Sequence, residues 1–172
     1  DRLTRDGDKP AEAVAGYGTV DGSPVYAFAQ DRDVCCGAIG RAQGAKIRRV
    51  YDLAAQNGAP VVGLFDSDGA KLGEGLDAMD ALAEILLISN RISGVVPQIA
   101  VVAGACVGSA ALVAANADIT VAVDGADYYL KPDEKGTAAV AAADVDEAID
   151  KVRGLLALLP SNNLTAAPAY DF

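Results

Sequence analysis

The chain has 172 residues, a formal net charge of −10 and 52% hydrophobic residues, with three Phe and no Trp. This length suits one domain with a sizeable core, and the Ala- and Gly-rich composition favours closely packed layers of helix on sheet. The negative charge, without a dense Lys/Arg face, argues against nucleic-acid binding, and no apolar run approaches the roughly 20 residues of a membrane-spanning helix.

The chain contains no His and three cysteines, Cys35, Cys36 and Cys106. Without His, a Ser–His–Asp or Cys–His nucleophile is excluded unless a partner chain supplies the base, and no metal site of the zinc type is expected. An odd number of cysteines, two of them adjacent, is not the pattern of a secreted disulfide framework. We therefore expect a cytoplasmic protein in which the cysteines are small buried hydrophobes.

The first half of the chain is predicted to contain a hairpin, two helices and a buried strand. Asp21–Gly22 lies between two strand-like runs, which is a strong hairpin signal, and Asn57–Gly58 is a helix-ending signal. The continuous apolar run Pro60–Phe65 is typical of strands buried in parallel sheets. In chain order the predictions are an irregular lead-in at 1–15, strands at 17–20 and 25–29, a loop at 31–37, a helix at 38–56, a strand at 60–65, a Gly-rich loop at 66–75 and a helix at 76–91.

The second half is predicted to contain a central strand and helix, a second hairpin and a last helix. Asp124–Gly125 marks the hairpin turn, Asp144 is expected to cap the last helix, and Pro160 is expected to stop it. In chain order the predictions are a strand at 99–103, a turn at 104–108, a helix through 115, strands at 119–123 and 126–129, a loop at 131–143, a helix at 145–159 and a tail at 161–172.

Strands that alternate with helices argue for parallel pairing in one sheet. Because parallel strands end at the same edge, the loops at 31–37, 66–75 and 104–108 are expected to gather there, where open α/β sheets bind ligands. The helix over 76–91 is expected to turn one apolar side to the core, made of Leu76, Met79, Ala83, Leu86 and Leu87.

The stretch Ile99–Ala115 reads IAVVAGACVGSAALVAA, an apolar strand, a small-residue turn and an Ala-rich helix. The first turn of a helix has N–H groups without intrahelical partners, and the peptide dipoles place partial positive charge there. Gly108 and Ser109 leave the space in front of these donors unobstructed. The residues alone therefore predict an anion or oxyanion site, with tight packing of a buried helix on a sheet as the alternative.

Four stretches, one of which overlaps Ile99–Ala115, carry a family resemblance in the family's order: GYGTVDGSPVYAFAQD (16–31), GAKIRRVYDLAAQNGAPVVGLFDSDGAKLGEGLDAM (44–79), SGVVPQIAVVAGACVGSAAL (93–112) and LLALLPSNN (155–163). With them the chain resembles the N-terminal half of the carboxyltransferase component of biotin-dependent acyl-CoA carboxylases and decarboxylases. The resemblance implies a single α/β domain of the crotonase-like ββα spiral fold over residues 16–160, with a tail or linker at 161–172.

The resemblance also implies an activity. In that family a carboxyl group passes between biotin and the α-carbon of a CoA thioester, and backbone N–H donors hold the enolate. For this chain it implies an acyl-CoA substrate, biotin covalently carried on a biotin carboxyl carrier protein, no metal, a second carboxyltransferase half-subunit and assembly into a homo- or hetero-oligomer.

By position, Gly108 and Ser109 match the family's Gly-Gly pair at the helix start, which implies a backbone oxyanion hole. Gly37 and Ala38 match a Gly-rich turn that lines the acyl-CoA site, and Gly69 and Ala70 belong to a nearby Gly-rich loop, so these four residues are expected to bind substrate.

The chain departs from the family pattern in places. Cys35–Cys36–Gly37 replaces a Phe-Gly-Gly turn, Ser109 replaces a glycine, Asp68 places a negative charge where a polyanionic CoA would lie, and segment 131–144 is much shorter than the family's covering segment.

Other interpretations stay open. The shortened segment and lost glycines favour a non-catalytic structural subunit. A crotonase-type hydratase or hydrolase would need a positioned carboxylate, for which Asp66 and Glu74 are the candidates, although a solvated loop or, with Asp68, a Mg²⁺ cluster also fits them. A cationic helix side could meet CoA phosphates or simply face solvent; its residues are Lys46, Arg48 and Arg49.

Overall fold

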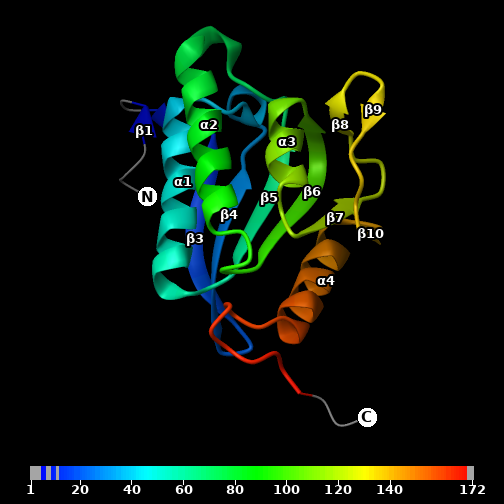
Figure 1. The fold of residues 1–172 in the computed structure, drawn as a ribbon. Helices are drawn as coiled ribbons and strands as arrows, with labels where there is room; N and C mark the ends of the chain where they lie inside the picture. Colours follow the sequence, from blue (N-terminus) through cyan, green and yellow to red (C-terminus); the bar gives the residue numbers. More distant parts are fainter. Residues whose placement is uncertain (1–4, 7–8, 11, 170–172) are drawn as a thin grey trace.

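The computed structural model describes residues 5–6, 9–10 and 12–169, and one twisted sheet runs through its centre (Figure 1). The strand order is β10-β7-β6-β5-β4-β3, and all neighbours are parallel except the hairpin pair β3–β4 at the edge. The strands of this path are β3 (Ala13–Val20), β4 (Ser23–Gln30), β5 (Val61–Ser67), β6 (Gln98–Val107), β7 (Ile119–Val123) and β10 (Val140–Ala142).

Two smaller strand pairs complete the pattern. β8 (Tyr128–Lys131) pairs in parallel with the end of β6 and, antiparallel, with β9 (Glu134–Lys135). β1 (Arg5–Asp6) and β2 (Lys9–Pro10) form a separate antiparallel pair.

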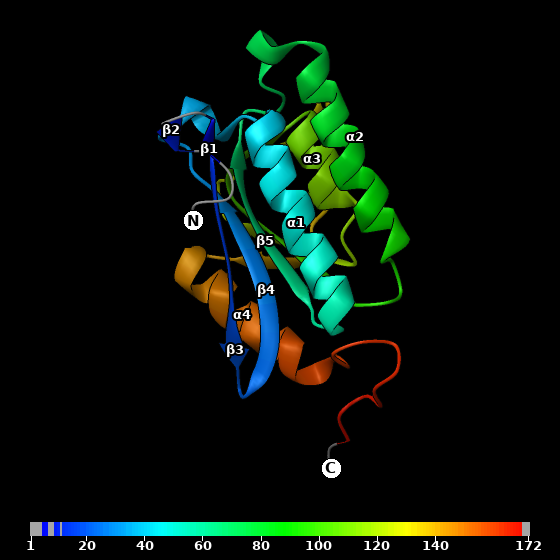
Figure 2. The same ribbon diagram turned by 90° about the vertical axis from the view of Figure 1, so that its left-hand side faces the viewer.

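Helices cover both faces of the sheet (Figures 1 and 2). On one face lie α1 (Arg41–Asn57), α2 (Leu76–Arg91) and α3 (Ser109–Ala115), and on the other lies α4 (Val145–Leu158). Side chains alternate along β6, so that Val102 joins the core under α1–α3 while Val101 joins the core under α4. This confirms the α/β class with a largely parallel sheet.

The first predicted hairpin is confirmed and is longer than expected. β3 and β4 pair over their full eight residues, from Ala13 opposite Gln30 to Val20 opposite Ser23. Asp21 and Gly22 turn the chain with φ of 49° and 82°, as a two-residue turn with two left-handed positions requires.

The second predicted hairpin is wrong, because β7 does not pair with β8. Residues 104–107 continue β6 as strand, and β8 pairs with this extension through Cys106 opposite Tyr128 and Val107 opposite Tyr129. The predicted loop at 131–143 likewise contains β9 and β10, and β10 lies beside β7.

The predicted bounds of α2 are confirmed, but its predicted buried side is wrong. Leu76, Met79 and Leu87 are 85%, 60% and 53% exposed. The buried side instead carries Ala78, Ala81, Ile85 and Ser89. The reason is close approach of α1 and α2: a Cβ added at Gly44 of α1 would lie 2.6 Å from the Cβ of Ala81. Small residues thus face α1, and Leu76, Met79 and Leu87 face outward.

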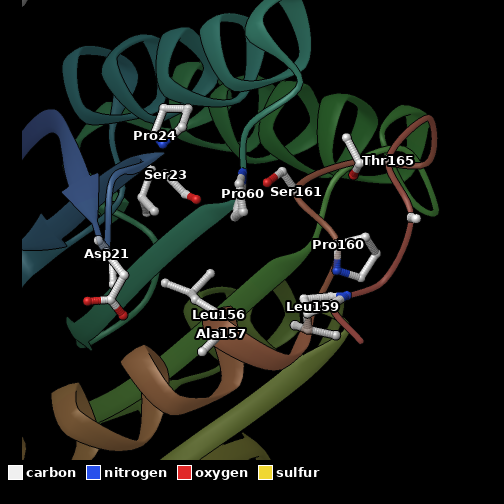
Figure 3. A pocket seen from close by; sticks show the side chains of 14 residues that line it. Asp21, Ser23, Pro24, Pro60, Leu156, Ala157, Leu159, Pro160, Ser161 and Thr165 are labelled. Atoms are coloured by element: carbon white, nitrogen blue, oxygen red, sulfur yellow. The ribbon is translucent and has the colours of Figure 1, made fainter. Parts of the chain in front are cut away.

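The predicted cap of α4 is confirmed, since Asp144 Oδ1 accepts a hydrogen bond from the Glu147 N–H at 2.8 Å. Beyond α4, Asn162 Nδ2 donates to Gly58 O at 2.8 Å and ties residues 161–169 to the amino-terminal edge of the sheet. A cavity of about 300 Å³ lies there, lined by the hairpin turn, the start of β5, the end of α4 and this tail (Figure 3). The domain boundaries at 16 and 160 stay predictions.

Among the described helices, none is long and apolar enough to cross a bilayer. The cytoplasmic location stays a prediction.

Candidate functional site

Three segments meet at the carboxyl edge of the sheet. They are the turn after β4, which contains the short 3₁₀ helix η1 (Cys35–Gly37), the loop after β5, which contains η2 (Leu72–Glu74), and the start of α3 after β6. Asp68 N–H donates to Cys36 O at 3.1 Å, which joins the first two segments. The expected gathering of loops at this edge is thus confirmed.

Ala70 presents an unpaired backbone donor at this edge. Ile39 N–H donates to Gly69 O at 2.7 Å, and Lys71 N–H donates to Ile39 O at 2.9 Å, as in a parallel bridge. These bonds use the peptide groups on either side of Ala70, so the Ala70 N–H points away from Ile39. It has no hydrogen-bond acceptor among residues 12–169.

At the start of α3, only one amide of the predicted pair is open. Gly108 N–H donates to Tyr129 O at 2.8 Å as part of the β6–β8 pairing, so Gly108 is not available as an oxyanion donor in this structure. Ser109, the first helical residue, has an N–H without an acceptor in the described part of the chain. Its buried Oγ also lacks a partner there.

The two open amides belong to segments in direct contact. Gly69, with φ of 99°, packs against the α3 start so closely that an added Cβ would lie 3.0 Å from Val107 O and 3.8 Å from Ser109 N. Only glycine suits this position, because of both the left-handed backbone and the narrow space. Gly69 therefore brings the loop that carries Ala70 against the start of α3, where the Ser109 N–H lies.

The remaining predicted site residues shape the edge through their own hydrogen bonds. Gly37 N–H donates to Val34 O at 3.0 Å, Ala38 N–H donates to Cys35 O at 3.1 Å, and Gly69 N–H donates to Ser67 Oγ at 3.1 Å. Their roles in binding substrate stay predictions.

Acidic residues of the loop are paired. Arg32 Nη1 lies 2.9 Å from Asp68 Oδ1 and 3.3 Å from Asp66 Oδ1, and its hydrogen bond to Asp68 is the main reason that the pKa of Arg32 is raised. Asp66 also accepts the Ala105 N–H at 3.0 Å and fills the space beside Gly104. The charge of Asp68 near a bound polyanion is thus offset by Arg32.

Glu74 has a structural position. Its Oε2 accepts the Arg41 N–H at 2.7 Å and caps α1, and its Oε1 lies 2.9 Å from Lys71 Nζ. The Arg41 N–H and then Lys71 lower the pKa of Glu74. Lys71 also contacts the buried Glu12 at 2.5 Å. Neither Glu74 nor Asp66 is therefore a free general base, which weakens the hydratase or hydrolase interpretation.

A buried glutamine pair was missed by the sequence reasoning. Gln43 Nε2 donates to Gly37 O at 2.9 Å and Ala38 O at 3.2 Å, while Gln43 Oε1 accepts from Gln30 at 2.9 Å. Gln30 Oε1 in turn accepts the Asp66 N–H at 3.2 Å. The pair fixes the turn after β4 to β5. Its sequence signal is weak, because it consists only of polar residues at inward-facing positions.

Other side chains also differ from expectation. Lys46 is buried and donates to Ala13 O at 2.8 Å, and Arg48 pairs with Glu84 at 2.8 Å, so the expected cationic side of α1 is largely engaged within the protein.

Of the three cysteines, Cys106 is buried as predicted, and its burial raises the pKa of its thiol to about 12. Cys35 and Cys36 are exposed, so their predicted burial is wrong.

The fold is that of the crotonase-like class, as the comparison with solved structures shows. The chain superposes on transcarboxylase 12S with a TM-score of 0.85 and 30% identity, over 91% of this chain and 35% of that one. This confirms the predicted crotonase-like fold.

Residues 2–131 match the carboxyl transferase domain, so the chain is a member of the carboxyl transferase family. It is 38% identical to the propionyl-CoA carboxylase beta chain of Saccharopolyspora erythraea, over 96% of this chain and 35% of the relative. It is 37% identical to the methylmalonyl-CoA decarboxylase subunit alpha of Veillonella parvula, over 94% of this chain and 37% of the relative. The chain thus spans about a third of the length of these relatives.

Proposed function

We propose that the chain forms the thioester-binding half of an acyl-CoA carboxyltransferase, in which a carboxyl group moves between biotin and the α-carbon of an acyl-CoA. The observation that carries this proposal is the pair of unpaired amides, Ala70 N–H and Ser109 N–H, on two touching segments. Family membership and the names of the relatives support a short-chain acyl-CoA as the substrate.

In this proposal the thioester carbonyl oxygen accepts hydrogen bonds from Ala70 and Ser109. Negative charge develops on that oxygen as the α-carbon loses or gains its carboxyl group, and fixed amide dipoles stabilise this charge without reorganisation. Such catalysis needs no protein nucleophile, which suits a chain without His. Biotin, carried on a separate carrier protein, supplies or accepts the carboxyl group.

The proposal includes a partner that completes the site. Four large apolar side chains of η2 and α2 are exposed, and we refer to them as the α2 stripe: Leu72, Leu76, Met79 and Leu87. Exposed large apolar side chains gathered on one element mark protein interfaces. We propose that the complementing second half of the carboxyltransferase covers this stripe, because Leu72 and the start of α2 follow directly on the loop that carries Ala70.

The partner proposal has a direct test. Leu76→Glu is expected to weaken association with the complementing half by at least about tenfold, since a charge at an apolar interface is costly. The matched control is Leu164→Glu in the tail, a position that is also exposed. Equal association of both variants with that half would rule out the α2 stripe as the interface.

The activity is tested by acyl-CoA binding and then by transfer. Titration with propionyl-CoA is expected to raise the free energy of unfolding, by about 2.7 kcal/mol at roughly 100 times the dissociation constant. Carboxyl transfer from a carboxybiotin donor is expected only when the complementing half is present.

A non-catalytic structural subunit stays the second candidate, favoured by the short β9 and β10 segments where the resemblance implies a longer cover. It is the correct assignment if millimolar acyl-CoA causes no stabilisation with the complementing half present. Turnover of acyl-CoA without biotin would instead exclude carboxyl transfer.

A further inference from the structure

Cys35 and Cys36 are adjacent exposed thiols at the carboxyl edge of the sheet, next to the candidate site. The function proposed above uses neither of them. The third cysteine, Cys106, is buried in the core and provides an internal comparison.

The backbone of both exposed cysteines is in the left-handed region, with φ of 50° at Cys35 and 54° at Cys36. Residues with a Cβ rarely adopt this conformation, and two in succession form a strained turn.

The carbonyl groups of the pair connect it to the candidate site. Cys35 O accepts the Ala38 N–H at 3.1 Å, and Cys36 O accepts the Asp68 N–H at 3.1 Å. The second bond ties the cysteine turn to the loop that carries Ala70. A movement of the Cys36 backbone is therefore transmitted to the loop that presents the amide donor.

Charged residues precede the pair in the chain. Asp31 and Asp33 lie just before the turn, and Arg32 between them is paired with Asp66 and Asp68. Both thiols are exposed, so an uncharged peroxide, which no local charge repels, can reach them.

We propose that Cys35 and Cys36 form an oxidative modification site, at which a peroxide converts the two thiols into a disulfide between neighbouring residues. One sulfur attacks a peroxide oxygen, which gives a sulfenic acid and one water. The second sulfur displaces the hydroxyl group of the sulfenic acid as a second water and forms the S–S bond. Together the two thiols lose two protons and two electrons, and the peroxide takes up these protons and electrons as it becomes two waters.

The new bond must disturb the turn. Adjacent Cα atoms are about 3.8 Å apart, less than the usual separation of disulfide-bonded residues. The ring therefore closes only with movement of the backbone, which weakens the hydrogen bond from Asp68 to Cys36. Strained disulfides of this kind are readily reduced, so the modification is reversible.

The modification itself is tested by mass spectrometry on the intact reduced chain, independently of any acyl-CoA activity. Hydrogen peroxide is added, free thiols are alkylated, and the chain is digested with trypsin. Cleavage at Arg32 and Arg41 gives the peptide 33–41, which contains both cysteines of the pair and no other. We expect this peptide to resist alkylation and to lose about 2 Da, the mass of two hydrogens.

Matched variants identify the bond. Cys106→Ala is expected to lose the same mass, whereas Cys35→Ser and Cys36→Ser are expected to stop at a sulfenic acid that dimedone traps. Full alkylation of the peptide after peroxide, or oxidation to sulfinic acid in the unsubstituted chain, would overturn the proposal.

The effect on the site is measured by hydrogen exchange. Oxidation is expected to make the Asp68 amide exchange about tenfold faster, as loss of a hydrogen bond does, and reduction with dithiothreitol is expected to restore it. Unchanged exchange at Asp68 in chain that carries the disulfide would exclude the coupling. Failure of propionyl-CoA to bind the reduced chain would count against the proposed function alone.

Discussion

Ser109→Pro removes one proposed catalytic donor and little else. Ser109 is the first residue of α3, and proline is well tolerated there because its fixed φ suits the helix and its missing N–H has no intrahelical role. The preceding Gly108, with φ of 56° and ψ of −115°, has the freedom to precede a proline. The ring must fit beside Gly69, which has no side chain.

The hydrogen bonds of the Ser109 N–H determine how far Ser109→Pro should change the free energy of unfolding and kcat. The Ser109 N–H has no acceptor among the described residues, so its removal breaks no bond of the fold, and the free energy of unfolding should change by less than about 1 kcal/mol. Loss of one of two oxyanion donors typically lowers kcat about 10²–10³-fold.

The assay is carboxyl transfer to propionyl-CoA by the chain assembled with its complementing half, with thermal unfolding measured in parallel. Ser109→Ala is the control, because it keeps the N–H and removes only an Oγ without a partner in the described structure. Its kcat should stay within about threefold of the unsubstituted chain. A stable Ser109→Pro variant with full activity would refute the assigned role of this amide.

Three further predictions concern stability. Cys36→Gly should raise the free energy of unfolding by about 0.5–1 kcal/mol in thermal or urea unfolding, because glycine relieves the left-handed strain but loses more backbone entropy; a loss of stability would contradict this. Gly44→Ala should destabilise by about 1–3 kcal/mol, since its Cβ meets Ala81, and an unchanged urea midpoint would argue against the close helix contact. Glu74 has a lowered pKa, so its linkage contribution is fully present above the unfolded value of 4.5 and is lost as the pH falls through the lowered folded value. The stability difference from Glu74→Gln should therefore shrink between pH 7 and about pH 3, and a pH-independent difference would contradict its pairing with Lys71.

Local signals in the sequence predicted much of the fold. The Asp21–Gly22 turn, the bounds of α2 and the Asp144 cap each depend on a few neighbouring residues, and all three are confirmed. The pairing of β8 with β6 depends on where β6 ends, which is decided by contacts distant in the sequence. The buried side of α2 was misassigned because a small-residue contact with α1, through Gly44, outweighs the apolar stripe.

The candidate site was predictable in position but not in its donors. The order of strands and loops predicted that three loops gather at the carboxyl edge of the sheet, and the structure confirms this gathering. Which backbone N–H groups lack an acceptor depends on tertiary hydrogen bonds. Tyr129 O accepts the Gly108 N–H, whereas the bridge between Ile39 and Ala70 leaves the Ala70 N–H without an acceptor among the described residues. No local pattern distinguishes these cases. The same holds for Gln43, whose three backbone acceptors are Glu12 O and, in a second segment, Gly37 O and Ala38 O.

The most direct test of the central claim is an NMR titration of the ¹⁵N-labelled chain, assembled with its complementing half, with propionyl-CoA. We expect the amide protons of Ala70 and Ser109 to show the largest downfield shifts and to saturate with one shared dissociation constant. Unchanged Ala70 and Ser109 signals, with the shifts confined to the cavity between Pro60 and Thr165 at the opposite edge, would contradict it.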